Sequence, residues 1–225
     1  PAVTILVGAL LTVLTAKYIG AAASSIGNLI VWSTQLHPFW MGILVSVVVG
    51  VALTLPISSA AICAAFGLVG LAGGAAVAGC CAQMVGFAVM SFKENRWGGI
   101  LSQGLGTSML QMPNIIKNPK VWIAPTLASA ITGPIATCLF KMEMNGAAVS
   151  SGMGTCGLVG QIGVVTGWFS PSETAVAHGA AAISPNFMNW LGLILICFVL
   201  PGVLCWAFGK VFRKIGWIKD GDLAL

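Results

Sequence analysis

The chain contains the same glycine-broken tetrapeptide twice, as "GLGT" at 104–107 and as "GMGT" at 152–155. Both copies interrupt apolar stretches. Glycine allows the backbone to come close to a ligand, and the threonines add hydroxyl groups that can donate or accept hydrogen bonds. Close packing of membrane helices through small residues is the alternative, and the sequence leaves it open. Neither copy continues as G-K-[ST], so neither is a phosphate-binding loop.

Uncharged amide side chains lie in or beside the same apolar stretches. In low-dielectric surroundings each amide needs hydrogen-bond partners. Amides donate and accept without carrying charge, which suits the hydroxyl groups of a sugar, but they could equally satisfy broken backbone. We therefore predict a binding site for a small polar solute between the two broken stretches. Its residues are Gly104, Gly106, Thr107, Ser108, Gln111, Asn114, Gly152, Gly154, Thr155, Gln161 and Gln83.

Glu173 and His178 form the one acid–histidine pair within a loop of small residues, and we add both to the predicted site. An acid and an imidazole could bind a polar solute or relay a proton. The alternatives are an exposed pair without function, or a helix that keeps the two side chains apart. The seven cysteines lie in apolar stretches without C-x-x-C spacing, which is typical of packing residues. We predict no metal, no cofactor and no catalytic residue.

The composition places the whole chain in a membrane. Of its 225 residues 58% are hydrophobic and 7% charged, whereas soluble domains carry about 25% charged residues. Alternating strand patterns are absent, which favours helices over a barrel. The sequence thus predicts an all-α integral membrane protein, a helical bundle with re-entrant or broken helices and a possible inverted repeat. The net charge of +5 is divided among small clusters between apolar runs, which is typical of membrane topology and not of nucleic-acid binding.

Apolar length predicts membrane spans over 39–56, 75–92, 121–140 and 187–210. We also expect a clipped helix over 3–16, an amphipathic interfacial helix over 19–38, a weak span over 57–74, broken segments over 98–116 and 146–168, and a loop over 169–186. These make one transmembrane domain, 1–210, and a cytoplasmic tail, 211–225. The chain begins with Pro1, so we expect that it lacks N-terminal helices of the full protein.

The distribution of basic residues orients these spans. The tail is basic, which places the C-terminus of a multi-pass membrane protein in the cytoplasm. Counting back along the chain, 97–116 begins and ends on the cytoplasmic side, and 141–186 begins and ends outside. The two broken segments would then enter from opposite faces. Paired glycine-interrupted segments in corresponding positions indicate the binding site of a transporter.

Longer stretches carry a resemblance to a known family. They are "LTLPISSAAI", "GCCAQMVGFAVMSFKEN", "GGILSQGLGTSMLQMPNIIKNP", "GMGTCGLVGQIG" and "RKIGWIKDGDLAL". Over roughly residues 28–225 the chain resembles the perfringolysin-regulator-like branch of the phosphotransferase-system EIIC membrane subunits. The resemblance implies a sugar-permease-like protein of the bacterial inner membrane. It also implies further N-terminal helices and soluble phosphotransferase components as partners. If the protein takes part in enzymatic phosphotransfer, it does so at most as the membrane component, since it has no phosphoryl-carrying residue.

Two functions remain open from the sequence. The first is a permease that moves a small polar solute by alternating access. The second is a membrane-embedded sensor or regulator that binds a ligand in the same place without transport. A channel would need a continuous polar path, and no ring of charges provides one. The expected partners are the lipid bilayer, the solute and the phosphotransferase components. A homo-oligomer is also compatible with the sequence, whereas nucleic acid is not expected.

Overall fold

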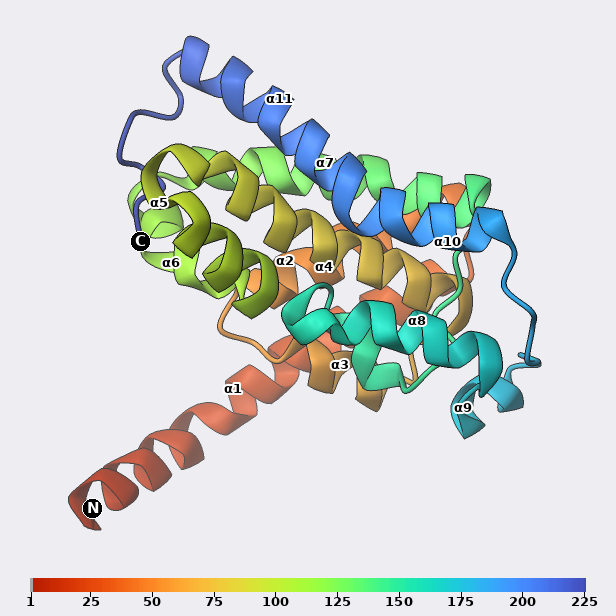
Figure 1. Cartoon of the computed structure of the whole chain (residues 1–225). Coiled ribbons are helices and arrows are strands. Elements are labelled where there is room, and N and C mark those ends of the chain that lie inside the picture. Colours follow the sequence, from red (N-terminus) through yellow and green to blue (C-terminus); the bar gives the residue numbers. More distant parts are fainter. Residues whose placement is uncertain (1) are drawn as a thin grey trace.

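The computed structural model describes residues 2–225, which form helices without a strand (Figure 1). In chain order the elements are α1 (Ala2–Thr34), α2 (Pro38–Thr54), α3 (Ser59–Ala65), α4 (Gly70–Met90), α5 (Phe92–Gly99), η1 (Ile100–Gly106), η2 (Ser108–Gln111), α6 (Met112–Lys117), η3 (Pro119–Trp122), α7 (Ile123–Pro134), η4 (Ile135–Leu139), η5 (Ala148–Gly152), η6 (Cys156–Leu158), α8 (Val159–Phe169), α9 (Glu173–Ala177), α10 (Phe187–Ile194), η7 (Leu195–Val199) and α11 (Leu200–Lys214), where η marks 3-10 or π-helical turns.

Three continuous helices are long and apolar enough to cross a membrane: Gly70–Met90, Pro119–Leu139 and Phe187–Lys214. They differ in how deeply the protein buries them. In the most apolar stretch of α4, 89% of the residues are buried, against 33% in the helix made of α10, η7 and α11. Helix α4 is therefore the centre of the bundle, and α10–α11 lies at its edge. The prediction of an all-α membrane protein is confirmed.

Helices α2, α4 and α7 pack closely through small residues. A side chain at Gly79 of α4 would overlap the backbone of Ser46 in α2. The Ser46 hydroxyl donates to the Ser129 carbonyl of α7 at 2.8 Å, and the Ser129 hydroxyl donates to the Gly79 carbonyl at 3.3 Å. Small residues let backbones approach, and hydroxyls then bond across the helices, as is usual in membrane bundles.

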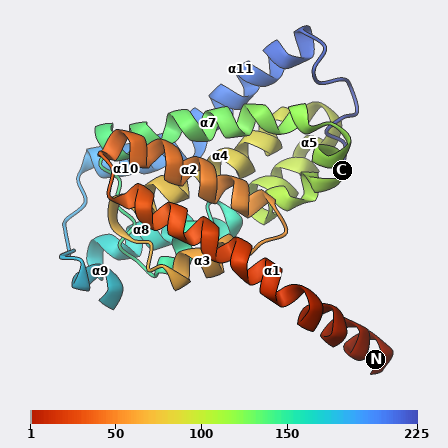
Figure 2. The same ribbon diagram turned by 180° about the vertical axis from the view of Figure 1, so that it is seen from behind.

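The bundle has two distinct ends (Figures 1 and 2). At one, which we call the tail end, α5 and α6 lie beside the C-terminus. At the other, the loop end, the chain turns through 141–147 and 170–186 near the start of α4. Gly70 and Met144 form an antiparallel bridge there.

Two expectations about single segments are wrong. The separate helices expected over 3–16 and 19–38 are one helix, α1, whose N-terminal half projects from the bundle (Figures 1 and 2). Nothing between the two stretches breaks a helix, whereas Pro38 disfavours helical backbone just before it. The weak span over 57–74 is divided into α3 and the start of α4. Gly67 and Gly70 separate them with left-handed backbone, at φ 58° and 65°.

The C-terminal residues are packed on the bundle. Helix α11 ends at Lys214, past the expected boundary at residue 210, and the chain then turns back. Ile218 and Leu223 are buried against the core around Phe87 and Ile115. The segment 215–225 is thus a docked strap, and we call it the tail. The division into 1–210 and 211–225 stays a prediction.

Candidate functional site

The first broken segment begins and ends at the tail end. Near its start, the Asn95 amide donates to the Leu223 carbonyl of the tail at 2.8 Å. Near its other end, the Asn114 amide donates to the Ala224 carbonyl at 2.8 Å. Between them η1 runs into the bundle along α4 and α6 returns. We call residues 92–117 the first hairpin.

The second broken segment begins and ends at the loop end. The Ser172 N–H donates to the Asn145 carbonyl at 2.9 Å, which joins its two ends. At the turn, Gly154, Gly157 and Leu158 have left-handed backbone, with φ of 53°, 52° and 59°. Gly154 lies against Cys80 and Cys81, about 15 Å along α4 from Gly70 at 1.5 Å per residue. We call residues 145–172 the second hairpin.

The two hairpins approach from opposite ends of the bundle and meet (Figure 1). Their innermost turns, η1 and η6, are in contact. Both G-x-G-T copies lie at these tips, one at 104–107 and the other at 152–155. The repeated sequence motif therefore marks two corresponding places in the fold.

The two copies are not equivalent in detail. A Cβ on Gly106 would have its nearest neighbour at 3.8 Å, whereas one on Gly154 would lie 2.6 Å from the Cys80 Cβ. The Thr107 hydroxyl oxygen accepts from the Met109 N–H at 3.2 Å and caps the following turn. Thr155 is fully buried and its hydroxyl has no partner. Close packing explains the glycines of the second copy but not its threonine.

A buried polar cluster lies beside the first tip. The Gln83 carbonyl oxygen accepts from the Trp122 Nε1–H at 2.9 Å and from the Thr54 hydroxyl at 3.2 Å. The Thr54 and Ser108 hydroxyls are 2.9 Å apart. These bonds link the end of α2, the middle of α4 and the first hairpin. Among the predicted site residues, Gln83 and Ser108 are thus brought together.

Three buried side-chain oxygens near the tips have no hydrogen-bond partner: Ser102 Oγ, Thr155 Oγ1 and Gln161 Oε1. The side-chain amide nitrogen of Gln161 lies 3.1 Å from the Cys81 sulfur, so within this amide only the oxygen lacks a hydrogen-bond partner. A buried polar group without a partner costs about 1–3 kcal/mol, and such groups are rare enough to need a reason. A polar solute or water between the hairpins would satisfy them.

Gln111 and Asn114, also predicted for the solute site, bond to the tail. The Gln111 amide donates to the Gln103 side-chain oxygen at 2.8 Å and to the Leu223 carbonyl at 3.0 Å. The Asn114 amide donates to the Gln111 side-chain oxygen at 2.8 Å as well as to the tail. In this state the two amides hold the tail and each other. The need for partners could be read from the sequence, but the identity of the partner could not.

Ion pairs add to the attachment of the tail. Lys93 contacts Asp220 at 2.7 Å, and Arg213 contacts Asp220 at 3.1 Å and Glu94 at 2.7 Å. The hydrogen bond and charge of Lys93 lower the pKa of Asp220, and the charge of Arg213 adds to this. The ionised carboxylate of Asp220 therefore stabilises the docked position of the tail.

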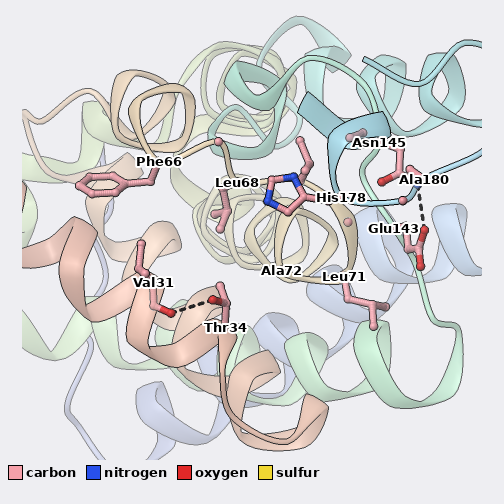
Figure 3. Close-up of a pocket in the computed structure, with 15 residues that line it drawn as sticks. Val31, Thr34, Phe66, Leu68, Leu71, Ala72, Glu143, Asn145, His178 and Ala180 are labelled. Carbon is pink, nitrogen blue, oxygen red and sulfur yellow. Dashed lines mark hydrogen bonds between the residues drawn. The ribbon is translucent and has the colours of Figure 1, made fainter. Parts of the chain in front are cut away.

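Glu173 and His178 are not brought together. Helix α9 places them at its two ends, and the structure gives no contact between these described side chains. His178 instead lines a cavity of about 460 Å³ at the loop end, together with Glu143 and Asn145 (Figure 3). The Asn145 amide donates to the Glu143 carboxylate at 2.8 Å. Glu143 and Asn145 were missed because the bridge that places them joins residues far apart in the chain.

In the described part of the chain, no group of three or more His, Cys, Asp or Glu side chains could hold a metal ion. The polar groups at the hairpin tips are instead amides and hydroxyls. Their chemistry is hydrogen bonding to a neutral polar molecule.

Comparison with known proteins identifies the family. The sequence model described as "Phosphotransferase system, EIIC" matches residues 1–225. The chain belongs to this family. The protein is accordingly a membrane-embedded, permease-type EIIC component of sugar transport by the phosphotransferase system. Comparisons with curated proteins and with solved structures give no match.

Proposed function

We propose that this EIIC protein binds a small polar solute, most simply a sugar, between the tips of its two hairpins. The observation that supports this most is the contact of η1 with η6 beside buried oxygens that lack protein partners. Irregular backbone is tolerated at membrane depth only where protein buries it or where it lines a polar cavity. Both hairpin tips are such irregular backbone.

The polar groups around the tips favour an uncharged solute with several hydroxyls. Gln83, Ser108, Thr155 and Gln161 offer donors and acceptors and carry no charge. A sugar hydroxyl both donates and accepts, so it matches amides and hydroxyls without the cost of burying an ion. Of the remaining predicted residues, Gln111 and Asn114 would take part only once the tail has moved.

The cavity at the loop end is the proposed way in for the solute. His178, Glu143 and Asn145 line it (Figure 3). With the hairpin tips in contact, a solute reaches the site only when the hairpins part, and alternating access supplies that motion. Glu173 faces solvent in this state, so its assignment to the site rests on the loop's position alone.

The orientation in the membrane belongs to the same proposal. The tail end faces the cytoplasm of a bacterium, where soluble phosphotransferase components would meet it, and the loop end faces outside. The hairpins are re-entrant from opposite faces within one transmembrane domain over 1–210, which could also assemble as a homo-oligomer. The basic last turn of α11 supports this orientation. Within the family, the motifs given above favour the perfringolysin-regulator-like branch.

Uptake of radiolabelled sugars into proteoliposomes tests the proposal through Thr155→Val. The Thr155 hydroxyl has no partner in the protein, so its removal should leave the melting temperature unchanged or slightly raised. If the hydroxyl binds the solute, uptake should fall about 2- to 12-fold, the equivalent of one neutral hydrogen bond to the solute.

Thr132→Val is the matched control, because that buried hydroxyl bonds to the Ala128 carbonyl of its own helix. It should leave uptake near the wild-type value. Equal uptake by the wild type and Thr155→Val across a sugar panel would argue against a site at the tips. Specific binding without uptake would instead indicate a membrane-embedded sensor.

A further inference from the structure

Another cavity lies at the tail end. It has a volume of about 390 Å³ and lies between the last turn of α4, the start of α5 and α11. Its floor is apolar, made by Val89, Met90 and Phe92 together with Trp206. An apolar floor at the end of a membrane helix is unsuited to a small soluble ion, which would lose its hydration there.

Four basic side chains form the rim of this cavity: Lys93, Arg96, Lys210 and Arg213. Only Asp220 and Glu94 oppose them: Asp220 pairs with Lys93 and Arg213, and Glu94 pairs with Arg213. Arg96 makes no ion pair within residues 2–225. The rim therefore keeps an excess of positive charge that the protein does not neutralise.

The exposed face of α11, extended by the last residue of η7, continues from the rim toward the middle of the bundle. Val199, Val203 and Trp206 are 43%, 56% and 51% exposed. With Lys210 they are spaced by three or four residues and so lie on one side of the helix. Lys210 Nζ lies 3.8 Å from the centre of the Trp206 ring, where a cation–π contact places the charge at the top of the apolar stripe.

We propose that this cavity binds the phosphate headgroup of an anionic phospholipid. The phosphate lies among Arg96, Lys210 and Lys93, and one acyl chain follows the α11 stripe past Trp206 and Val203. Tryptophan and basic residues at a helix end are typical of the membrane interface, and basic pockets between membrane helices bind anionic headgroups. The proposal is independent of the solute site, because it uses no residue of either hairpin tip.

The test measures thermal unfolding of the full chain in neutral detergent with added lipid. Phosphatidylglycerol should raise the melting temperature saturably, and phosphatidylcholine with the same acyl chains should raise it much less. In the double variant Arg96→Gln/Lys210→Gln, the apparent affinity for phosphatidylglycerol should fall about 25-fold, or about five-fold for each basic side chain removed. Neither residue takes part in an ion pair, so the lipid-free melting temperature checks that the fold is kept.

The control is Lys117→Gln/Lys214→Gln, which removes the same charge at the same end but outside the cavity. It should keep the wild-type response to phosphatidylglycerol. An equal loss in both double variants would overturn the proposal, since it would show only a general charge effect. Stabilisation by inorganic phosphate or glycerol 3-phosphate alone would overturn it too, by showing a site for a free anion.

Discussion

Gly154 combines left-handed backbone with close packing of the second hairpin against α4. Its φ is 53°, and a Cβ there would lie 2.6 Å from the Cys80 Cβ and 2.9 Å from the Cys81 nitrogen. Gly106, its counterpart in the first hairpin, has neither constraint. Packing of small residues, the alternative left open by the sequence, thus accounts for one copy of the motif and not for the other.

Alanine substitution at these two glycines should separate their roles. Gly154→Ala should lower the free energy of unfolding by about 2–4 kcal/mol, because strain at positive φ adds to overpacking against α4. Gly106→Ala should change it by less than about 0.5 kcal/mol. Denaturant titration in mixed micelles measures both. Equal destabilisation by the two changes would contradict the asymmetry of the tips.

The tail and the first hairpin act as one element. Asn95 binds the tail from both sides of its amide: it donates to the Leu223 carbonyl at 2.8 Å and accepts from the Leu225 N–H at 2.9 Å. Asn118 donates to the Trp217 carbonyl at 2.9 Å and to the Asp222 carboxylate at 2.8 Å. Both ends of the hairpin are therefore anchored to the same strap, so a motion of the hairpin either carries the tail or releases it.

Asn114→Asp should loosen this attachment. Aspartate cannot donate, so the Ala224 carbonyl and the Gln111 side-chain oxygen would each face a carboxylate in place of an N–H. Losing these buried bonds should cost about 1–3 kcal/mol. Amide exchange of residues 217–225 should then accelerate at least five-fold, as measured by mass spectrometry.

Asn186→Asp is the matched control for that change. Asn186 caps α10 by accepting from the Asn189 N–H, and an aspartate accepts equally well at this position. It should leave exchange in the tail unaltered. Unchanged exchange in Asn114→Asp would show that its amide does not hold the tail.

For the molecule as a whole, patterns local in the chain could be predicted and long-range placements could not. Apolar length placed the spans near α4, α7 and α10–α11, and small polar interruptions marked both hairpins. The bend after α3 was missed because two left-handed glycines, Gly67 and Gly70, and not a charge or proline, cause it. The loop-end cavity depends on the bridge between Gly70 and Met144, which no local sequence pattern predicts. Docking of the tail likewise depends on contacts between residues far apart in the chain.

Measuring the membrane topology is the most direct test of the proposal that the two hairpins enter the membrane from opposite faces. Single cysteines are placed at Gly98, Lys117 and Ala177, all exposed, in a background in which serine replaces Cys138 and Cys156, the cysteines that are not buried. A membrane-impermeant maleimide is then added to intact cells and to inside-out vesicles. We predict that Gly98→Cys and Lys117→Cys react from the cytoplasmic face and Ala177→Cys from the outer face. Labelling of Gly98→Cys and Lys117→Cys from opposite faces would contradict it, because the first hairpin would then cross the membrane.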